Sequence, residues 1–174
     1  MKSKLAIAAI LMTMIMGCNK LKHIPFEYSY HKYITVPQAP IPGTTLTIPV
    51  TIPTNIDSVM EANKTKPNLL ESAKLKTLAL SVYQPSGGTF GVLRSIDIYV
   101  TDGSNDILIA SQHDIPATAT TLDMAVNDVE LKPYLTAQNM NLKATVTTST
   151  GMTQEMTLYF DMRIRFEANL LEIF

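Results

Sequence analysis

Tryptophan is absent from this 174-residue sequence, and cysteine occurs only once, at Cys18. A single cysteine excludes an internal disulfide, so the folded chain depends on a hydrophobic core for its stability. The lack of tryptophan and of a cysteine pair also excludes the core residues that mark antibody domains. The roughly 155 residues after Cys18 are enough for one domain that buries about two-thirds of its unfolded surface.

Sequence patterns for catalysis are missing as well. No Gly-x-Ser-x-Gly segment is present to hold a nucleophilic serine on a sharp turn. His113 adjoins Asp114, but neighbouring residues of a strand point to opposite faces, so adjacency does not make them a catalytic pair. We therefore predict that the protein is not an enzyme, and a hydrolase based on His113 or on paired carboxylates is the least favoured alternative.

Metal and cofactor motifs are not recognisable either. A zinc site needs three or four ligands at characteristic spacings, and the sequence has no such group. Asp102, Ser104 and Asp106 alternate within one loop, but the glycine position does not fit an EF-hand loop and the bidentate glutamate is missing. A hairpin turn explains the same residues, so we predict no metal and no cofactor.

The charge balance argues against nucleic acid as a partner. Of the fourteen lysines and arginines, Lys2 and Lys4 lie at the extreme N-terminus, which leaves twelve against fifteen acidic residues in the rest of the chain. A nucleic-acid-binding domain instead carries an excess of basic residues that neutralise phosphates. We predict no nucleic-acid partner.

The N-terminus has the features of an export signal. Lys2 and Lys4 precede an uncharged apolar run at residues 5–16, which is too short to span a bilayer as a helix. The run ends in Ile15-Met16-Gly17-Cys18, which resembles the lipobox of bacterial lipoproteins. This resemblance implies that residues 1–17 are a signal peptide cut before Cys18, and that Cys18 carries the acyl chains. Two or three acyl chains hold a protein stably on a membrane, whereas one does so only marginally.

The residue after the lipidation site bears on the location of the protein. In the best-known sorting scheme of bacterial lipoproteins, an aspartate at this position retains the protein in the inner membrane, and this chain has Asn19. The resemblance therefore implies an outer-membrane lipoprotein of the cell envelope, and we expect its domain to face the periplasm. An ordinary signal peptide or an uncleaved anchor, with Cys18 incidental, is the alternative.

From residue 26 onward, apolar residues recur at every second position, as in strands with one buried and one solvated face. The clearest example is a long strand near the C-terminus in which Met156, Leu158, Phe160, Met162, Ile164 and Phe166 alternate with mainly polar residues. Similar patterns predict about eight strands in all, at residues 26–36, 46–52, 78–82, 96–100, 107–110, 122–126, 142–146 and 156–166.

Turn residues separate these runs. Asp102-Gly103-Ser104-Asn105 predicts a hairpin, because Gly103 adopts positive φ without steric cost. Thr150 and Gly151 predict a second hairpin that leads into the last strand. The prolines at residues 37–53 lack the ladder donor, so strands there are expected at sheet edges. Short helical turns are expected from the capping-box spacing of Ser58 to Glu61 and at residues 130–137.

These elements predict an all-β fold: an antiparallel β-sandwich of about seven to eight strands, with immunoglobulin-like layers and one or two short helical turns. A closed barrel is the alternative. We expect a lipidated tether at residues 18–25 and a single β-sandwich domain at residues 26–174.

The first strand is rich in aromatic residues. Phe26, Tyr28 and Tyr30 are expected on one face, and His31 and Tyr33 on the other. Such rings can stack on sugars or on an aromatic peptide, although core packing explains one face equally well and the absence of tryptophan argues against a glycan-binding surface.

The leading hypothesis is a non-catalytic, lipid-anchored envelope lipoprotein that serves as a binding or assembly module. Its expected partners are the membrane, through the N-terminal lipid, and an envelope protein or glycan. The alternative is a carbohydrate-binding or adhesin module that uses Phe26, Tyr28, Tyr30 and Tyr33.

Overall fold

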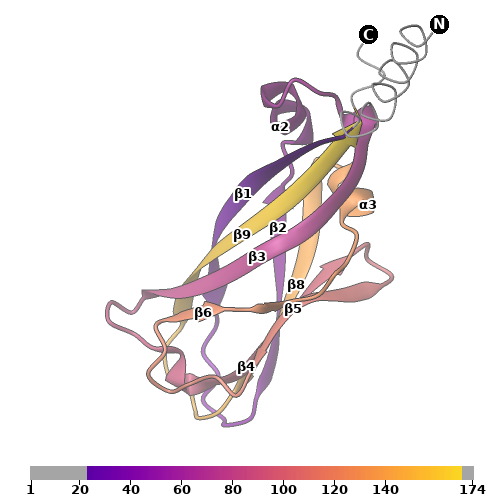
Figure 1. Ribbon diagram of the computed structural model, residues 1–174. Coiled ribbons are helices and arrows are strands. Elements are labelled where there is room, and N and C mark those ends of the chain that lie inside the picture. The colour runs from indigo at the N-terminus through magenta and orange to yellow at the C-terminus, as the bar shows by residue number, and fades with distance from the viewer. Residues whose placement is uncertain (1–22, 170–174) are drawn as a thin grey trace, which may run out of the picture.

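The computed structural model describes residues 23–169, which form two antiparallel β-sheets packed face to face (Figure 1). The strand order is β1-β9-β3-β6 in the four-stranded sheet and β2-β8-β4-β5-β7 in the five-stranded sheet. These two layers confirm the predicted β-sandwich, with nine strands rather than seven or eight. The strands are β1 (His23–Val36), β2 (Thr45–Pro53), β3 (Leu70–Gln84), β4 (Leu93–Thr101), β5 (Asp106–His113), β6 (Thr121–Asp123), β7 (Ala125–Val126), β8 (Asn139–Thr148) and β9 (Met156–Asn169).

The core lies between the two sheets and consists of the alternating apolar residues of each strand. In β9, Phe160, Met162, Ile164 and Phe166 are fully buried, whereas the residues between them point outward. Ile96, Ile98 and Val100 of β4 and Leu142, Ala144 and Val146 of β8 come from the facing sheet and are buried in the same cluster. Burying each large side chain contributes about 1.5–3 kcal/mol, so this period-two pattern is the main source of stability.

Two short helices and two 3-10 turns connect the strands: α2 (Ile56–Ala62), η2 (Pro67–Leu69), η3 (Phe90–Val92) and α3 (Lys132–Leu135). Helix α3 lies where the sequence predicts it, with its proline in the first turn. The predicted start at Ser58 is wrong, because α2 begins two residues earlier. Its N-cap is Asn55 in the left-handed conformation, and no side chain caps this N-terminus, whereas the Asn63 side chain donates to the Val59 carbonyl at the other end.

The connections between strands agree only in part with those predicted from the sequence. β4 and β5 form the predicted hairpin, in which Gly103 has φ +92° and the Asp102 carboxylate accepts hydrogen bonds from the Ser104 and Asn105 N–H groups. The hairpin predicted at Thr150 and Gly151 is wrong, because β8 and β9 belong to different sheets. A turn signal shows that the chain changes direction, but not which sheet receives the next strand.

The prolines correctly predict one of the edge strands. β2, which contains Pro49 and Pro53, is an edge strand of the five-stranded sheet, as predicted. β1 is an edge of the other sheet and starts at His23, three residues before the predicted strand, because its pairing with β9 extends to His23 and Asn169. The predicted signal peptide at residues 1–17 and the predicted lipidation site Cys18 lie outside the described residues. Within residues 23–169, no helix is long and apolar enough to cross a membrane.

Glu130 ties the segment before α3 to strand β3. Its carboxylate accepts hydrogen bonds from the backbone N–H groups of Ala73 and Lys132, at 2.8 and 2.9 Å, and from the Ser72 hydroxyl at 2.7 Å. Partial burial raises the pKa of the Glu130 carboxyl, but these hydrogen bonds outweigh it and hold the pKa below its ordinary value of 4.5. The charged carboxylate is therefore stabilised by folding.

The substitution Glu130→Gln should lower the free energy of unfolding at pH 7 by about 0.5–1 kcal/mol, a small value because solvent screens this partly exposed group. The stabilisation by Glu130 is complete above pH 4.5 and is lost as the pH falls through the lowered pKa of the folded state. Urea denaturation should show a larger difference between the two proteins at pH 7 than at pH 3. Glu155→Gln, in the exposed β8–β9 connection, should change little at either pH.

Candidate functional site

The aromatic residues predicted as a binding set are divided between the two faces of β1. Tyr30 is only 4% exposed, and Phe26 and Tyr28 are partly buried against the core. Phe26 stacks on the fully buried Phe166, with ring centroids 5.2 Å apart. Three of the four predicted residues therefore pack inward, and Tyr33, which is 54% exposed, lies on the outer face.

Tyr30 has a structural partner at the end of the sandwich. Its hydroxyl donates a hydrogen bond of 2.8 Å to the carbonyl oxygen of Thr54, between β2 and α2. Burial raises the pKa of the Tyr30 phenol far above its usual range, so the hydroxyl stays protonated and remains a donor.

The substitution Tyr30→Phe leaves the buried Thr54 carbonyl without this donor and should lower the free energy of unfolding by about 1–2 kcal/mol. Ligand binding at the outer face should be unchanged, because the ring of Tyr30 points into the core. Chemical denaturation of the variant tests the first statement. An unfolding free energy equal to that of the unchanged protein would show that water replaces the hydroxyl at no cost.

Tyr33 belongs to a group of aromatic side chains on the outer face of the four-stranded sheet, in which Tyr159 is partly buried and the other members are exposed. We call His31, Tyr33, Tyr83 and Tyr159 the aromatic patch. The ring centroid of Tyr33 lies 4.6 Å from that of Tyr83 and 5.4 Å from that of Tyr159, and the two rings of each pair are tilted relative to each other. His31 stacks on Tyr159 at 5.7 Å with an interplanar angle of 11°. The four rings thus form one continuous surface across β1, β9 and β3.

Strand pairing assembles this patch from distant parts of the chain. Tyr33 of β1 pairs directly with Tyr159 of β9, and Tyr159 pairs on its other side with Ser81 of β3. A register shift between Val82 and Gln84 places Tyr83 in an irregular stretch at the end of β3. Bulges of this kind redirect side chains. The sequence analysis found His31 and Tyr33 but missed Tyr83 and Tyr159, whose only signal is an aromatic residue at an outward position of a strand.

Carboxylates lie in the next row of outward residues. Asp161 of β9 pairs with His31 on one side and with Ala79 on the other, and Ala79 also pairs with Asp123 of β6. His31 Nδ1 lies 3.3 Å from an Asp161 carboxylate oxygen. The carboxylates of Asp161 and Asp123 therefore stand on either side of the small Ala79 side chain, beside the aromatic patch. The arrangement offers ring surfaces together with hydrogen-bond acceptors.

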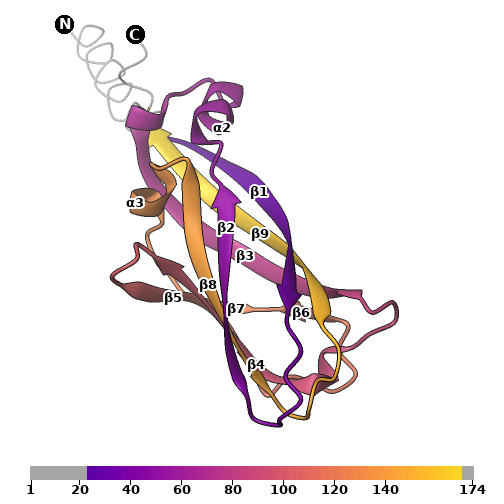
Figure 2. The ribbon, with the colours of Figure 1, turned by 180° about the vertical axis from the view of Figure 1, so that it is seen from behind.

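The patch lies far from the end at which the described chain begins. β1 starts at His23, and Tyr33 is ten residues further along the same strand, which corresponds to about 33 Å. Figure 1 shows β1 and β9 running side by side from that end of the sandwich toward the other, and Figure 2 shows the five-stranded sheet on the opposite side. The aromatic patch therefore lies on one broad face, away from the start of the first strand.

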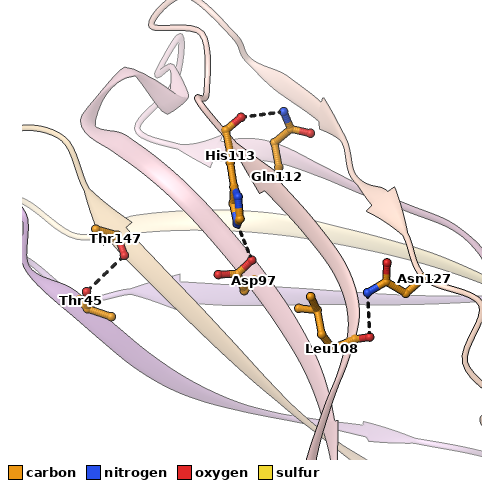
Figure 3. A network of polar contacts seen from close by, with 7 residues as sticks. All are labelled: Thr45, Asp97, Leu108, Gln112, His113, Asn127 and Thr147. Atoms are coloured by element: carbon orange, nitrogen blue, oxygen red, sulfur yellow. Dashed lines mark hydrogen bonds and ion pairs between the residues drawn. The ribbon is translucent and has the colours of Figure 1, made fainter.

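A second polar group lies on the outer face of the five-stranded sheet. His113, the last residue of β5, is held by a 2.8 Å contact between its Nε2 atom and an Asp97 carboxylate oxygen on β4 (Figure 3). These two residues line a shallow hollow of about 370 Å³ together with Arg94, Ser95 and Asp114. The partner of His113 is therefore not its neighbour in sequence but a residue across the strand pair.

Neither this hollow nor a larger one at the end of the sandwich shows a metal-binding group. Within residues 23–169, no three His, Cys, Asp or Glu side chains are arranged to hold a metal ion. The larger hollow, about 520 Å³, lies between the end of β2, helix α2 and the segment after α3, and is lined in part by Thr54, Ile56 and Leu135. Its lining combines apolar side chains with loop residues and brings no catalytic pair together.

Comparisons with known proteins give only remote similarities. No family model matches the chain, and no curated protein matches it. Among solved structures, the capsid of Helicobacter pylori bacteriophage KHP30 is 10% identical with a TM-score of 0.36, over 84% of this chain and 94% of that one. Desmodium yellow mottle tymovirus is 15% identical with a TM-score of 0.31, over 86% and 91%.

The GH31 CBM32-2 structure bound to GalNAc is 12% identical with a TM-score of 0.34, over 68% of this chain and 66% of that one. Similarity at this level identifies neither a family nor a function for the chain. The functional argument therefore depends on its own residues.

Proposed function

We propose that the protein is a non-catalytic, lipid-anchored protein of the cell envelope whose β-sandwich binds carbohydrate through the aromatic patch. The exposure of these rings is the observation that carries the proposal: Tyr33 and Tyr83 are each 54% exposed, although they pack against each other. Contiguous apolar surface that remains open to water on a folded domain often marks a ligand-binding surface.

The chemistry of the aromatic patch suits a sugar. One face of a pyranose ring presents C–H bonds that pack on an aromatic ring, whereas the hydroxyl groups around its edge need hydrogen-bond partners. The patch offers three tyrosine rings and the neighbouring Asp161 carboxylate. Cross-strand aromatic pairs also stabilise a sheet, but this role does not require the rings to stay half exposed.

The expected anchor fits this use of the domain. Lipid on Cys18 would hold the chain at a membrane, five residues before β1 begins at His23. The aromatic patch lies about 33 Å further along β1, so a membrane at that end leaves the patch free to meet a polymer. The His113–Asp97 pair lies on the other sheet and contributes nothing to this surface.

The anchor is tested by metabolic labelling in a bacterial host with an alkyne analogue of palmitate. The full-length protein should incorporate the label and fractionate with membranes, and Cys18→Ala should do neither. Label on both proteins, or on neither, would refute lipidation at Cys18. Sucrose-gradient separation of the membranes then tests the expected outer-membrane location.

Carbohydrate binding is tested by affinity electrophoresis of the full-length protein, purified in mild detergent, through gels that contain laminarin, mannan, xylan or dextran. We expect at least one polysaccharide to retard the protein, and Tyr33→Ala with Tyr159→Ala to remove most of the retardation, because each ring contact contributes about 0.5–1.5 kcal/mol. Tyr99→Ala, on the outer face of the five-stranded sheet, is the matched control and should leave binding intact.

If no polysaccharide retards the protein, the aromatic patch is not a carbohydrate site. Capture of a protein through Tyr33 and Tyr159 would instead support an assembly role. Thermal unfolding of each variant distinguishes lost binding from lost folding.

A further inference from the structure

The aromatic patch consists of rings that contact one another on the outer face of the sheet. None of the hollows described above includes His31, Tyr33, Tyr83 or Tyr159 in its lining, and neither does a third of about 340 Å³ on the opposite sheet. The rings contact one another at centroid distances of 4.6–5.7 Å, which leaves no slot for a sugar between them. A ligand therefore lies on top of the rings, with its other side in water.

An open surface of this kind favours a long ligand. A single sugar on one ring gains one stacking contact but still loses its full translational and rotational freedom, so its net affinity is low. The ring contacts run in sequence from His31 to Tyr159, from Tyr159 to Tyr33, and from Tyr33 to Tyr83 on β3. Successive sugar units of one glycan can stack on successive rings, so the translational and rotational freedom of the ligand is lost only once for several contacts.

The charges around the patch select against an acidic chain. The four cations on the same sheet face are already paired with carboxylates: Lys74 with Asp128, Lys76 with Glu27, Arg163 with Glu27 and Arg165 with Glu167. Lys32 lies between His31 and Tyr33 in sequence, so its side chain leaves the strand on the other face.

The groups beside the rings are acceptors, and one of them, Asp161, also contacts His31 at 3.3 Å. Asp161 and Asp123 flank Ala79 in the adjacent row, and the Asp161 side chain is 42% exposed. Carboxylates accept hydrogen bonds from sugar hydroxyl groups and repel the carboxylates or sulfates of acidic polysaccharides. From this geometry we infer that the aromatic patch binds an internal stretch of an uncharged glycan chain, and that it takes neither single sugars nor acidic polysaccharides. This inference rests on the proposed carbohydrate-binding function.

The experiment compares glycans of different length and charge in one set of measurements on the full-length protein in detergent. Gels containing laminarin, mannan, xylan or dextran are compared with gels containing alginate or polygalacturonate. The oligosaccharides of the retarding uncharged polysaccharide, from monosaccharide to hexasaccharide, are then titrated by calorimetry. We expect retardation only by uncharged chains, and a dissociation constant at least about tenfold lower for the hexasaccharide than for the disaccharide.

Two variants test the source of the charge selection. Asp161→Asn combined with Asp123→Asn should allow alginate or polygalacturonate to retard the protein, because the repelling carboxylates are gone. Asp114→Asn combined with Asp57→Asn, both exposed and outside the four-stranded sheet, changes the net charge equally and should not. If both double variants bind acidic chains alike, net charge rather than the local carboxylates is responsible and the inference is wrong.

The remaining outcomes separate the inference from the proposed function. Equal affinity for monosaccharide and hexasaccharide, or retardation of the unchanged protein by acidic chains, would overturn the inference while leaving carbohydrate binding in place. No binding to any polysaccharide would overturn the proposed function and the inference together. Thermal unfolding of each variant confirms that it is folded at the temperature of the measurement.

Discussion

The pairing of β9 between β1 and β3 is the constraint on which the rest of the structure depends. β9 is hydrogen-bonded on both sides along most of its length, so every one of its side chains is committed to one face of the sheet. Phe160, Met162, Ile164 and Phe166 fill the core. A shift of register by one residue would expose this set and bury Asp161, Arg163 and Arg165, which makes any other register very costly. The same constraint fixes Tyr159 and Asp161 on the outer face.

The outer face is therefore a consequence of core formation. Once the inner residues of β9 are buried, Tyr159 must stand beside Tyr33 of β1, and the irregular end of β3 adds Tyr83. Toward the start of β1, the outward positions hold paired charges such as Glu27 with Lys76. The face thus divides into a charged half near the beginning of the first strand and an aromatic half away from it. This division fits the proposal that the domain binds a ligand away from an N-terminal lipid anchor.

The edge strands β1 and β2 lie beside each other and are protected in different ways against pairing with a further strand. β2 carries Pro49 and Pro53, which remove backbone donors from its ladder. β1 has Lys32 at a position whose neighbours Tyr30 and Ile34 are buried, and a charge there disfavours pairing with another strand. These two edges are guarded, whereas the aromatic patch is left open, which favours the broad face over these edges for the proposed binding.

The sequence by itself determined the elements whose cause is local. Alternation in β9, the turn at Gly103, the edge position of the proline-bearing strand and the helical turn at Pro133 were all predicted, because each depends on a few neighbouring residues. The split of the aromatic residues of β1 between two faces also follows from the period of a strand. The sequence did not determine which face was the core.

Only the tertiary structure decided which strands became neighbours, and with them the candidate site. The signal at Thr150 and Gly151 is the same for a hairpin and for a crossing between sheets, and the choice between them depends on burial over both sheets at once. Likewise, Tyr83 and Tyr159 join Tyr33, and Asp97 joins His113, through pairings between residues distant in the chain. Periodicity determines the face of a side chain, whereas its neighbours on that face depend on the packing of the whole domain.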